Sequence, residues 1–242
     1  TVVTDYRPHS WWVSDHVDTY VVGSEGARND LIMKWSTPPS KVKILGIPVE
    51  PIFSKPLDKM KIRERFGLQS DAFTILVIGG GFGVGPIEGI VRAIGKLLEP
   101  AQAIVICGHN EILVRKTELL KSESKIPIKI LGFIDNVYEF MEAADILISK
   151  SGGITVSESL AKDLPMIVIS PIPGQETHNS DFLIANGAGV KADTTADLEA
   201  ILEGLISHPE KIERMKESIR RIKRPRACYD IGKLALEEAA GG

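Results

Sequence analysis

The sequence is poor in cysteine, in net charge and in long apolar runs. Its two cysteines, Cys107 and Cys228, are too few for a disulfide framework, which favours a reducing, cytoplasmic setting. The net charge of −3 argues against a nucleic-acid-binding domain, since such domains are strongly basic. No stretch reaches the roughly 20 continuous apolar residues that a membrane span needs. The 5 histidines form no i, i+4 pair, so the sequence predicts no metal site and no cofactor.

What the sequence does contain is a regular alternation of β-branched apolar runs and amphipathic stretches. This alternation is typical of parallel βαβ units, so it predicts an α/β fold with a doubly wound, Rossmann-like parallel sheet. The expected strands are Val2–Val3, Thr19–Val22, Val42–Leu45, Thr74–Ile78, Ala103–Cys107, Ile128–Leu131, Asp145–Ser149, Met166–Ile169 and Gly189–Lys191. The expected helices are Pro86–Leu98, Glu111–Lys121, Val137–Ala144, Thr155–Ala161, Asn179–Asn186, Thr195–Ile206, Pro209–Arg221 and Ala227–Ala239.

Prolines between Ile47 and Pro56 mark a domain boundary. They disfavour a helix and predict an extended linker over residues 51–56. We expect residues 1–50 to be the end of a first domain and residues 57–222 to be a complete second domain. The remaining residues, 223–242, are predicted to form a helix that packs back on the first domain. Because the chain opens with Thr-Val-Val-Thr-Asp rather than Met, we expect the first domain to be truncated.

Polar, glycine-bearing loops follow two consecutive predicted strands. The first, Ser151-Gly152-Gly153-Ile154-Thr155, leads into a helix, and the second contains the turn Gly174-Gln175-Glu176. Ligands of open α/β sheets bind outside the carboxyl ends of the strands, and helix N-termini attract phosphate. The two loops therefore predict a site for a phosphorylated, hydroxyl-rich ligand.

A third loop, Gly79–Gly85, also lies between a strand and a helix. It fails the dinucleotide pattern G-x-G-x-x-G, because Pro86 occupies the last position, and it fails the P-loop pattern for want of a lysine. Either its backbone contacts a diphosphate in another way, or its glycines only allow tight packing of strand on helix.

Several side chains allow both a structural and a functional interpretation. Glu158 follows Thr155 by three residues, so it forms a capping box or holds a ribose diol. Polar groups at 174–179 bind sugar hydroxyls or are ordinary loop residues, and Phe133 is a wall for a base or an apolar anchor. His9 is a weak candidate for a general base on the acceptor side, beside Trp11 and Trp12. The basic residues between Arg220 and Arg226 form a solvated face or contact an anionic membrane.

Separate blocks of the sequence resemble one enzyme family. The blocks are Val3–Tyr6 with His9 and Trp12, Val17–Val22, Gly46–Val49, Ile78–Gly81, Gly132-Phe133, Ala144-Asp145, Ser149–Thr155 with Glu158, and Pro171–Glu176. They resemble the glycosyltransferases that make monogalactosyl- and glucosyl-diacylglycerol. More distantly, they resemble the lipid-linked N-acetylglucosaminyltransferase of peptidoglycan synthesis.

The resemblance implies two facing Rossmann-like domains (the GT-B type), of which the second binds a UDP-sugar and the first a lipid acceptor. It implies inverting, metal-independent transfer of a hexose at a membrane surface. By position, Phe133 would lie against uracil through its backbone, and Glu158 would hold the ribose. The other expected donor contacts are Gly81, Phe82, Gly83, Ser151, Gly152, Gly153 and Thr155 for the diphosphate and Gly174, Gln175, Glu176 and Asn179 for the hexose.

One departure from the family concerns catalysis. The family's Gly-Gly-x-His segment, which supplies the expected base, is absent from these 242 residues. We therefore expect the chain to bind a UDP-sugar but not to transfer it alone. The alternatives are a donor-binding subunit of a two-component glycosyltransferase, a UDP-sugar epimerase, and a nucleotide-binding regulatory module without turnover.

Overall fold

The centre of the protein is a parallel β-sheet of six strands. The computed structural model describes residues 1–81, 83, 85–98, 100–170 and 172–241. Within them the sheet has the order β5-β4-β3-β6-β7-β8, with every pairing parallel. The strands are β3 (Phe73–Ile78), β4 (Ala101–Ile106), β5 (Ile128–Leu131), β6 (Ile146–Ser149), β7 (Met166–Ile169) and β8 (Gly189–Ala192). This is the strand order of a doubly wound fold, so the predicted fold class is confirmed.

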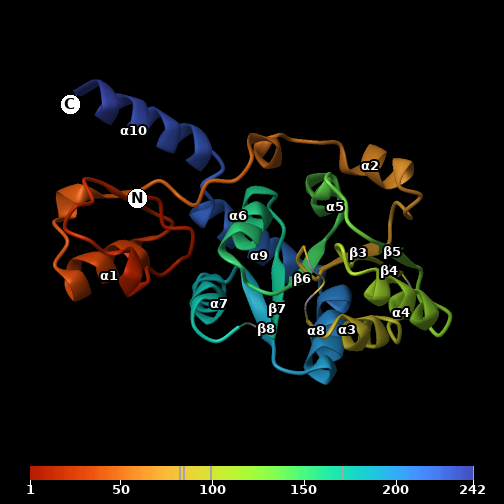
Figure 1. The fold of residues 1–242 in the computed structure, drawn as a ribbon. Coiled ribbons are helices and arrows are strands. Elements are labelled where there is room, and N and C mark those ends of the chain that lie inside the picture. Colours follow the sequence, from red (N-terminus) through yellow and green to blue (C-terminus); the bar gives the residue numbers. More distant parts are fainter. Residues whose placement is uncertain (82, 84, 99, 171, 242) are drawn as a thin grey trace.

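The sheet is apolar on both faces, as expected for a parallel sheet covered by helices. In β3, Ile75 and Val77 point into one core while Leu76 points into the other. Figure 1 shows the two helical layers. One layer comprises α3 (Ile87–Ile94), α4 (Glu111–Lys121) and α8 (Thr195–Ser207). The other comprises α5 (Val137–Ala143), α6 (Gly153–Ala161) and α7 (Gln175–Ala185). Helix α9 (Pro209–Ile222) contributes Ile212 to the first core and Ile219 to the second.

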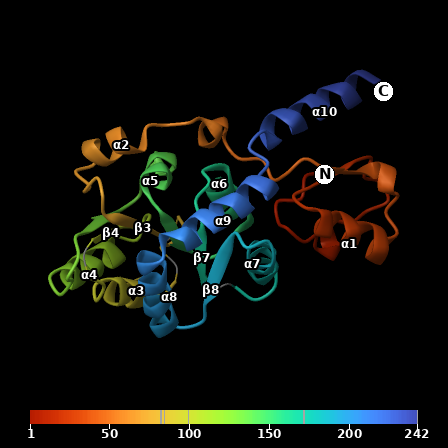
Figure 2. The same cartoon turned by 180° about the vertical axis from the view of Figure 1, so that it is seen from behind.

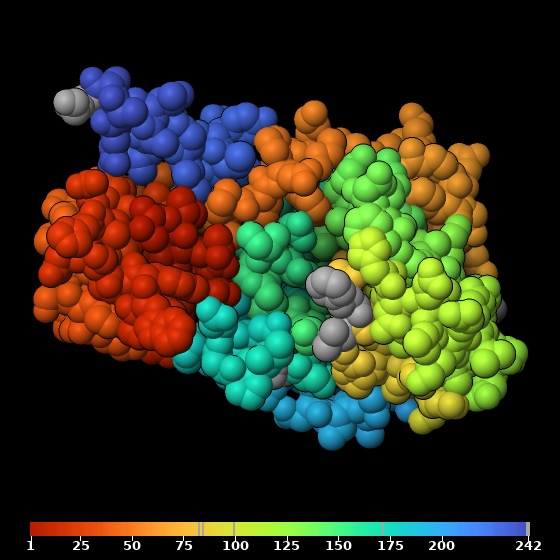
Figure 3. Space-filling view, viewed as in Figure 1, coloured from red at the N-terminus to blue at the C-terminus, as the bar shows by residue number. Residues whose placement is uncertain are grey.

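Residues 1–50 form a smaller unit beside α6 and α7 (Figures 1 and 3). It contains η1 (Ser10–Trp12), β1 (Tyr20–Val22), α1 (Glu25–Trp35), η2 (Pro39–Lys41) and β2 (Val42–Ile44). Its strands pair in parallel, and it has its own apolar cluster around Tyr20 and Leu31. The predicted strand Val2–Val3 is wrong, because Val2 makes only an isolated bridge to Val21.

The chain passes between the two units twice. The first passage, predicted as an extended linker, contains the short 3-10 helix η3 (Pro51–Ser54), and α2 (Lys59–Arg65) follows it. Pro51 stands at the first helical position, where a missing N–H costs nothing, so the prolines do not exclude this helix.

The second passage leads from α9 into α10 (Ala227–Gly241), which lies over the smaller unit in Figure 2. Thr19 Oγ1 donates a hydrogen bond of 2.5 Å to Glu238 Oε1 on α10. The two passages touch each other, since a Cβ built on Gly46 would lie 2.5 Å from Arg224 Cβ. The smaller unit is therefore held to the larger one by two adjacent lengths of chain.

Candidate functional site

Three loops meet at the carboxyl edge of the sheet, at the point where the strand order reverses. Ile78 pairs with Ser149 and Ser149 with Val168, so β3, β6 and β7 end at the same level. The Ser149 hydroxyl donates to the carbonyl of Ile78 at 2.9 Å, which fastens the ends of the first two strands together. The loops over residues 79–85, 150–152 and 170–174 consequently begin side by side, at a topological switch point.

Of the helices that follow strands of the sheet, α3, α5, α6 and α7 begin without a side-chain cap, and of these four α6 and α7 have glycine at the N-cap position. Gly152 and Gly174 are the N-cap residues of α6 and α7, so no N-cap side chain accepts a hydrogen bond from the first N–H groups of either helix. By contrast, Asn110 and Thr194 cap α4 and α8 through their side chains. The first N–H groups of α6 and α7 are therefore available to an anion, which the partial positive charge of a helix N-terminus also attracts.

These helix starts correct two predictions. The start of α6 lies at Gly153 rather than Thr155, so Thr155 is its third residue and the capping box with Glu158 is wrong. The start of α7 lies at Gln175 rather than Asn179, so Gln175 and Glu176 form its first turn instead of a loop. Gly174 makes this early start possible, because it adopts φ +99°, which side-chain-bearing residues rarely do.

Glu158 has an environment unlike that of a surface glutamate. Its carboxyl is largely buried and, within the described part of the chain, takes part in no hydrogen bond or ion pair. Burial, with a smaller contribution from the negative charge of Glu50, raises the pKa of Glu158 from 4.5 to about 7. A carboxyl that is largely buried and has no protein partner, one and a half turns into α6, is suited to accept hydrogen bonds from a bound ligand.

Two predicted contact residues, Ser151 and Asn179, are instead fully buried. Asn179 Nδ2 donates to Asp5 Oδ1 at 2.8 Å and to the Ser151 carbonyl at 2.9 Å, while its Oδ1 accepts from Tyr6 N at 2.8 Å. Ser151 Oγ donates to the Glu176 carbonyl at 2.6 Å. The side chains of Asn179 and Ser151 therefore hold the smaller unit and both loops together, and their full burial keeps them from a ligand.

The smaller unit rests directly on the start of α6. A Cβ on Gly153 would lie 2.0 Å from the Thr4 carbonyl oxygen and 3.0 Å from Asp5 Oδ1. A Cβ on Gly152 would meet nothing within 4 Å, so the backbone there is approachable. Of the two predicted glycine contacts, Gly153 serves the contact between the units and Gly152 is open to a ligand.

The loop after β7 is closed by Glu176. Its Oε2 accepts from Ile172 N at 2.6 Å, and its Oε1 lies 3.8 Å from Lys150 Nζ. Gln175, one residue earlier, is exposed at the start of α7. Gln175 is thus free to contact a ligand, whereas one carboxylate oxygen of Glu176 is already committed.

The glycines of the loop after β3 have different surroundings: one packs against the protein and another faces open space. A Cβ on Gly83 would lie 2.4 Å from the Cys107 carbonyl oxygen, which explains why this position requires glycine. Gly81 faces open space, and its carbonyl accepts from His109 N at 3.0 Å. Gly83 therefore packs the loop on β4, Gly81 is approachable, and Phe82 lies outside the described residues.

An aromatic pair that the sequence analysis missed lies at the ends of β4 and β5. The rings of His109 and Phe133 stack with centroids 4.1 Å apart and planes inclined by 13°. Both residues are exposed, Phe133 to 59%. Each directly follows a glycine, Gly108 and Gly132, just beyond a strand end, and this repeated Gly–aromatic step was the available signal.

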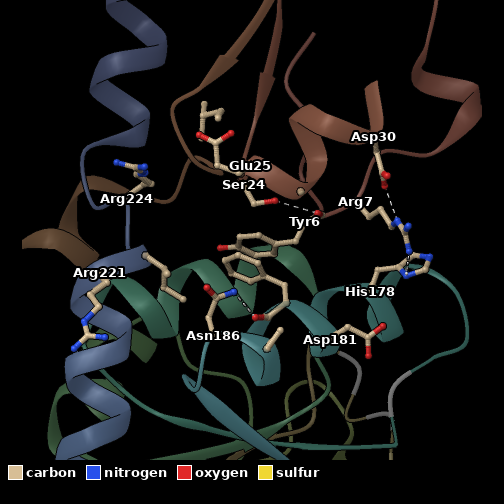
Figure 4. Close-up of a pocket in the computed structure, with 16 residues that line it drawn as sticks. Tyr6, Arg7, Ser24, Glu25, Asp30, His178, Asp181, Asn186, Arg221 and Arg224 are labelled. Carbon is tan, nitrogen blue, oxygen red and sulfur yellow. Dashed lines mark hydrogen bonds and ion pairs between the residues drawn. The ribbon is translucent and has the colours of Figure 1, made fainter. Parts of the chain in front are cut away.

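A cleft of about 540 Å³ separates the smaller unit from α7 and α9 (Figure 4). Arg221 and Arg224 lie at one end and Arg7 and His178 at the other, with Tyr6 between them. The Tyr6 ring stacks on Phe182 at 3.9 Å. The cleft thus combines a stacked aromatic pair with guanidinium groups, a lining that suits a ligand with polar and apolar parts.

His9 lies away from this cleft, at the start of η1. It is exposed, and its Nδ1 accepts from Trp11 N at 3.3 Å. Its neighbour Trp11 is 89% exposed. Across the described ranges, no group of three or more His, Cys, Asp or Glu side chains is arranged to hold a metal ion.

The sequence was compared with known protein families. The profile described as "Glycosyltransferase family 28 C-terminal domain" matches residues 74–227, which contain the six-stranded sheet and all three loops of the site. The chain belongs to glycosyltransferase family 28. A second profile, "Monogalactosyldiacylglycerol (MGDG) synthase", matches residues 1–49, the smaller unit. The predicted family resemblance is confirmed.

Individual family members agree with this assignment. The chain is 32% identical over 221 residues to the processive diacylglycerol beta-glucosyltransferase of Bacillus pumilus, covering 90% of this chain and 57% of that protein. It is 32% identical over 244 residues to the probable monogalactosyldiacylglycerol synthase 2, chloroplastic, of Oryza sativa subsp. japonica, covering 96% and 51%. The chain therefore spans little more than half the length of these curated relatives.

A solved structure confirms the predicted GT-B type of fold. MurG of Acinetobacter baumannii superposes with a TM-score of 0.73 at 19% identity, over 98% of this chain and 65% of that chain. As for membrane crossing, none of the helices described is both long enough and apolar enough to span a bilayer.

Proposed function

We propose that the chain is the donor-binding part of an inverting glycosyltransferase that transfers a hexose from a UDP-sugar to a diacylglycerol-type lipid. We also propose that no metal ion or cofactor takes part. The donor-binding function is supported by membership of family 28, by the names of relatives that act on diacylglycerol, and by the site at the carboxyl edge of the sheet. The observation that carries it is the pair of uncapped helix starts with glycine at the N-cap, α6 and α7, at the carboxyl edge of the sheet beside the switch point.

The diphosphate is assigned to the start of α6. Its approach leads over Gly152, beside the open backbone of Gly81. There the unpaired N–H groups of the first turn offer hydrogen bonds and a partial positive charge. Thr155, partly buried in the same turn, adds a hydroxyl.

The remaining parts of the donor extend to either side. Uracil belongs at the ends of β4 and β5, against Phe133. Glu158 accepts hydrogen bonds from the ribose diol. Gln175 binds the hexose hydroxyls together with Glu176 Oε1, the oxygen that lies 3.8 Å from Lys150 Nζ. This order places the base, the ribose and the sugar along one edge of the sheet.

The chemistry is a single displacement at the anomeric carbon. A hydroxyl oxygen of the acceptor forms the new bond as the bond from the anomeric carbon to the diphosphate breaks, which inverts the configuration. The negative charge that develops on the diphosphate is stabilised by the N–H dipoles of α6, which are already oriented before the reaction. The resemblance assigns the base that takes the acceptor proton to the Gly-Gly-x-His segment.

Contact with a membrane surface follows from a lipid acceptor. All four arginines of the basic cluster are exposed, but Arg221 and Arg224 line the cleft, whereas Arg220 and Arg226 lie outside it. We assign Arg220 and Arg226 to contact with anionic lipid headgroups. Co-sedimentation with vesicles of phosphatidylcholine and phosphatidylglycerol should fall when both arginines are replaced by glutamate, and unchanged sedimentation would refute the assignment.

The donor site itself is tested by calorimetric titration of the chain with UDP. We expect one site, which competes with UDP-glucose or UDP-galactose. Gly152→Asp would place a carboxylate in the approach to α6 and should abolish binding without unfolding the protein. A folded wild-type protein that does not bind UDP would refute the proposal.

A further inference from the structure

The stacked pair of His109 and Phe133 is built by backbone contacts rather than by chance proximity. Ile106 pairs with Leu131, so β4 and β5 end together and present the two residues at neighbouring positions. The His109 backbone is fixed on both sides: its N–H donates to the Gly81 carbonyl at 3.0 Å, and its carbonyl accepts from Glu111 N at 3.2 Å.

Gly108 makes the approach of these loops possible. It has φ +60°, and a Cβ there would lie 2.4 Å from the Gly81 carbonyl oxygen. The His109 ring is therefore held by a backbone with little freedom, whereas Phe133 is 59% exposed. Among the described residues, the His109 ring makes no ion pair and no hydrogen bond, so its stacking on Phe133 is its principal contact.

We infer that His109 is a positioning residue for the nucleobase of the donor. Its ring holds the Phe133 ring, and with it the Gly132-Phe133 backbone, in the orientation that receives the base. This inference rests on the proposed function, because it adds a residue to the same UDP site. Through its N–H, His109 also joins the base end of the site to the Gly81 loop at the diphosphate end.

The size of the effect follows from the energy of such pairs. An aromatic pair contributes a modest amount beyond the area that it buries, equivalent to about a two- to tenfold change in affinity. Replacing His109 by alanine frees the Phe133 ring and should weaken UDP binding by that factor. His109→Phe keeps a flat ring over Phe133 and should restore the affinity, whereas His109→Leu should not.

The decisive experiment is a double-mutant cycle measured by UDP calorimetry. It uses the wild-type chain, His109→Ala, Phe133→Ala and the double variant, with thermal melting to show that each is folded. His208→Ala, a change at an exposed histidine between α8 and α9, is the matched control and should leave UDP affinity unchanged. If His109 acts through Phe133, the double variant binds UDP no more weakly than Phe133→Ala alone.

Three results would overturn the inference. They are an unchanged affinity in His109→Ala, no effect of Phe133→Ala, and single effects that multiply in the double variant, which would mean that His109 contacts UDP independently. Failure of the proposed function is seen separately, since the wild-type chain would then not bind UDP at all.

Discussion

Replacing Glu158 by glutamine should change stability and affinity in opposite directions. Burial, followed by the charge of Glu50, raises the pKa of Glu158 from 4.5 to about 7. A carboxyl whose pKa is raised by folding costs no stability at a pH below its pKa in the unfolded chain. Between pH 4.5 and pH 7 the unfolded chain ionises first, so the free energy of unfolding falls across that window and stays low above it.

The magnitude follows from the size of this shift. At 1.36 kcal/mol per pKa unit the upper bound is about 3 kcal/mol, and partial exposure of the side chain reduces it to about 1–3 kcal/mol. Glu158→Gln removes the ionisation and should therefore unfold about 1–3 kcal/mol less readily than the wild type at pH 8. At pH 4 the two proteins should be equally stable.

The same substitution should weaken UDP. Hydrogen bonds to a charged acceptor contribute about 1.5–3 kcal/mol, so the loss of the carboxylate should lower affinity by about ten- to a hundredfold at pH 8. Wild-type affinity should rise between pH 6 and pH 8 as Glu158 ionises. Ionisation of the nucleotide phosphate affects both proteins alike, so the ratio of their affinities isolates Glu158.

The assays are urea denaturation from pH 4 to pH 9 and UDP calorimetry over the same range. Glu217→Gln, a change at an exposed glutamate on α9, is the control and should alter neither measurement. A Glu158→Gln protein that is less stable at pH 8 would refute the burial argument. One that is more stable but binds UDP normally would refute the role in the ribose contact.

Three further substitutions test the contacts around the site. Asn179→Leu removes three hydrogen bonds, two of them buried, and should lower the free energy of unfolding by about 2–4 kcal/mol in urea. Gly153→Ala, whose Cβ would lie 2.0 Å from the Thr4 carbonyl oxygen, should destabilise by about 1–3 kcal/mol and raise the rate of proteolysis between the units. Asp145→Asn breaks its ion pairs with Lys59 and Arg63 and should cost about 2–4 kcal/mol at pH 7. Although burial opposes it, the cationic partners hold the pKa of Asp145 below 3.8, so this stabilisation is present above that pH and should vanish on acidification.

Each of these predictions has an internal comparison. Gly152→Ala adds a methyl group into open space and should change stability by less than about 0.5 kcal/mol, so an equal loss in both glycine variants would contradict the proposed clash. Asn29→Leu alters an exposed asparagine on α1 and should be nearly neutral. A constant difference between wild type and Asp145→Asn from pH 2 to pH 8 would exclude the ion pairs as its cause.

The sheet and the location of the site could be predicted because their signals are local. Apolar β-branched runs such as Ile146–Ile148 identify buried strands, and polar glycine-bearing loops at their ends identify a ligand edge. These features depend only on residues within one βα unit. They can therefore be recognised without knowledge of the rest of the chain.

The role of individual polar residues could not be predicted in the same way. Ser151 and Asn179 look like ligand contacts because they stand in a polar motif at a strand end. Asn179 instead bonds to Asp5 and Tyr6, more than 170 residues earlier in the chain, and Ser151 bonds to the Glu176 carbonyl and to Asn179. Whether a polar group is satisfied by protein or by ligand is a tertiary property, and local sequence does not contain it.

Helices α1 and α2 were not predicted from the sequence, and the cause is again a lack of local signal. In α1 only Ala27 and Leu31 are buried, so its apolar periodicity is weak. The short helix α2 is held by ion pairs from Lys59 and Arg63 to Asp145, far along the chain. Neither helix has the continuous apolar stripe that a sequence pattern detects.

The contact between Gly46 and Arg224 has a mechanical consequence. Because both covalent passages meet there, a relative movement of the two units that keeps this contact is a rotation about that point, which would act as a hinge. Leu160 borders the same small cavity as Gly46 and Arg224, and Gly153 lies seven residues along α6, a lever of about 10 Å. An opening of only about 10° would draw Thr4 away from Gly153 by about 2 Å. That is enough to break the hydrogen bond from Asn179 to Asp5 while the contact between Gly46 and Arg224 stays in place.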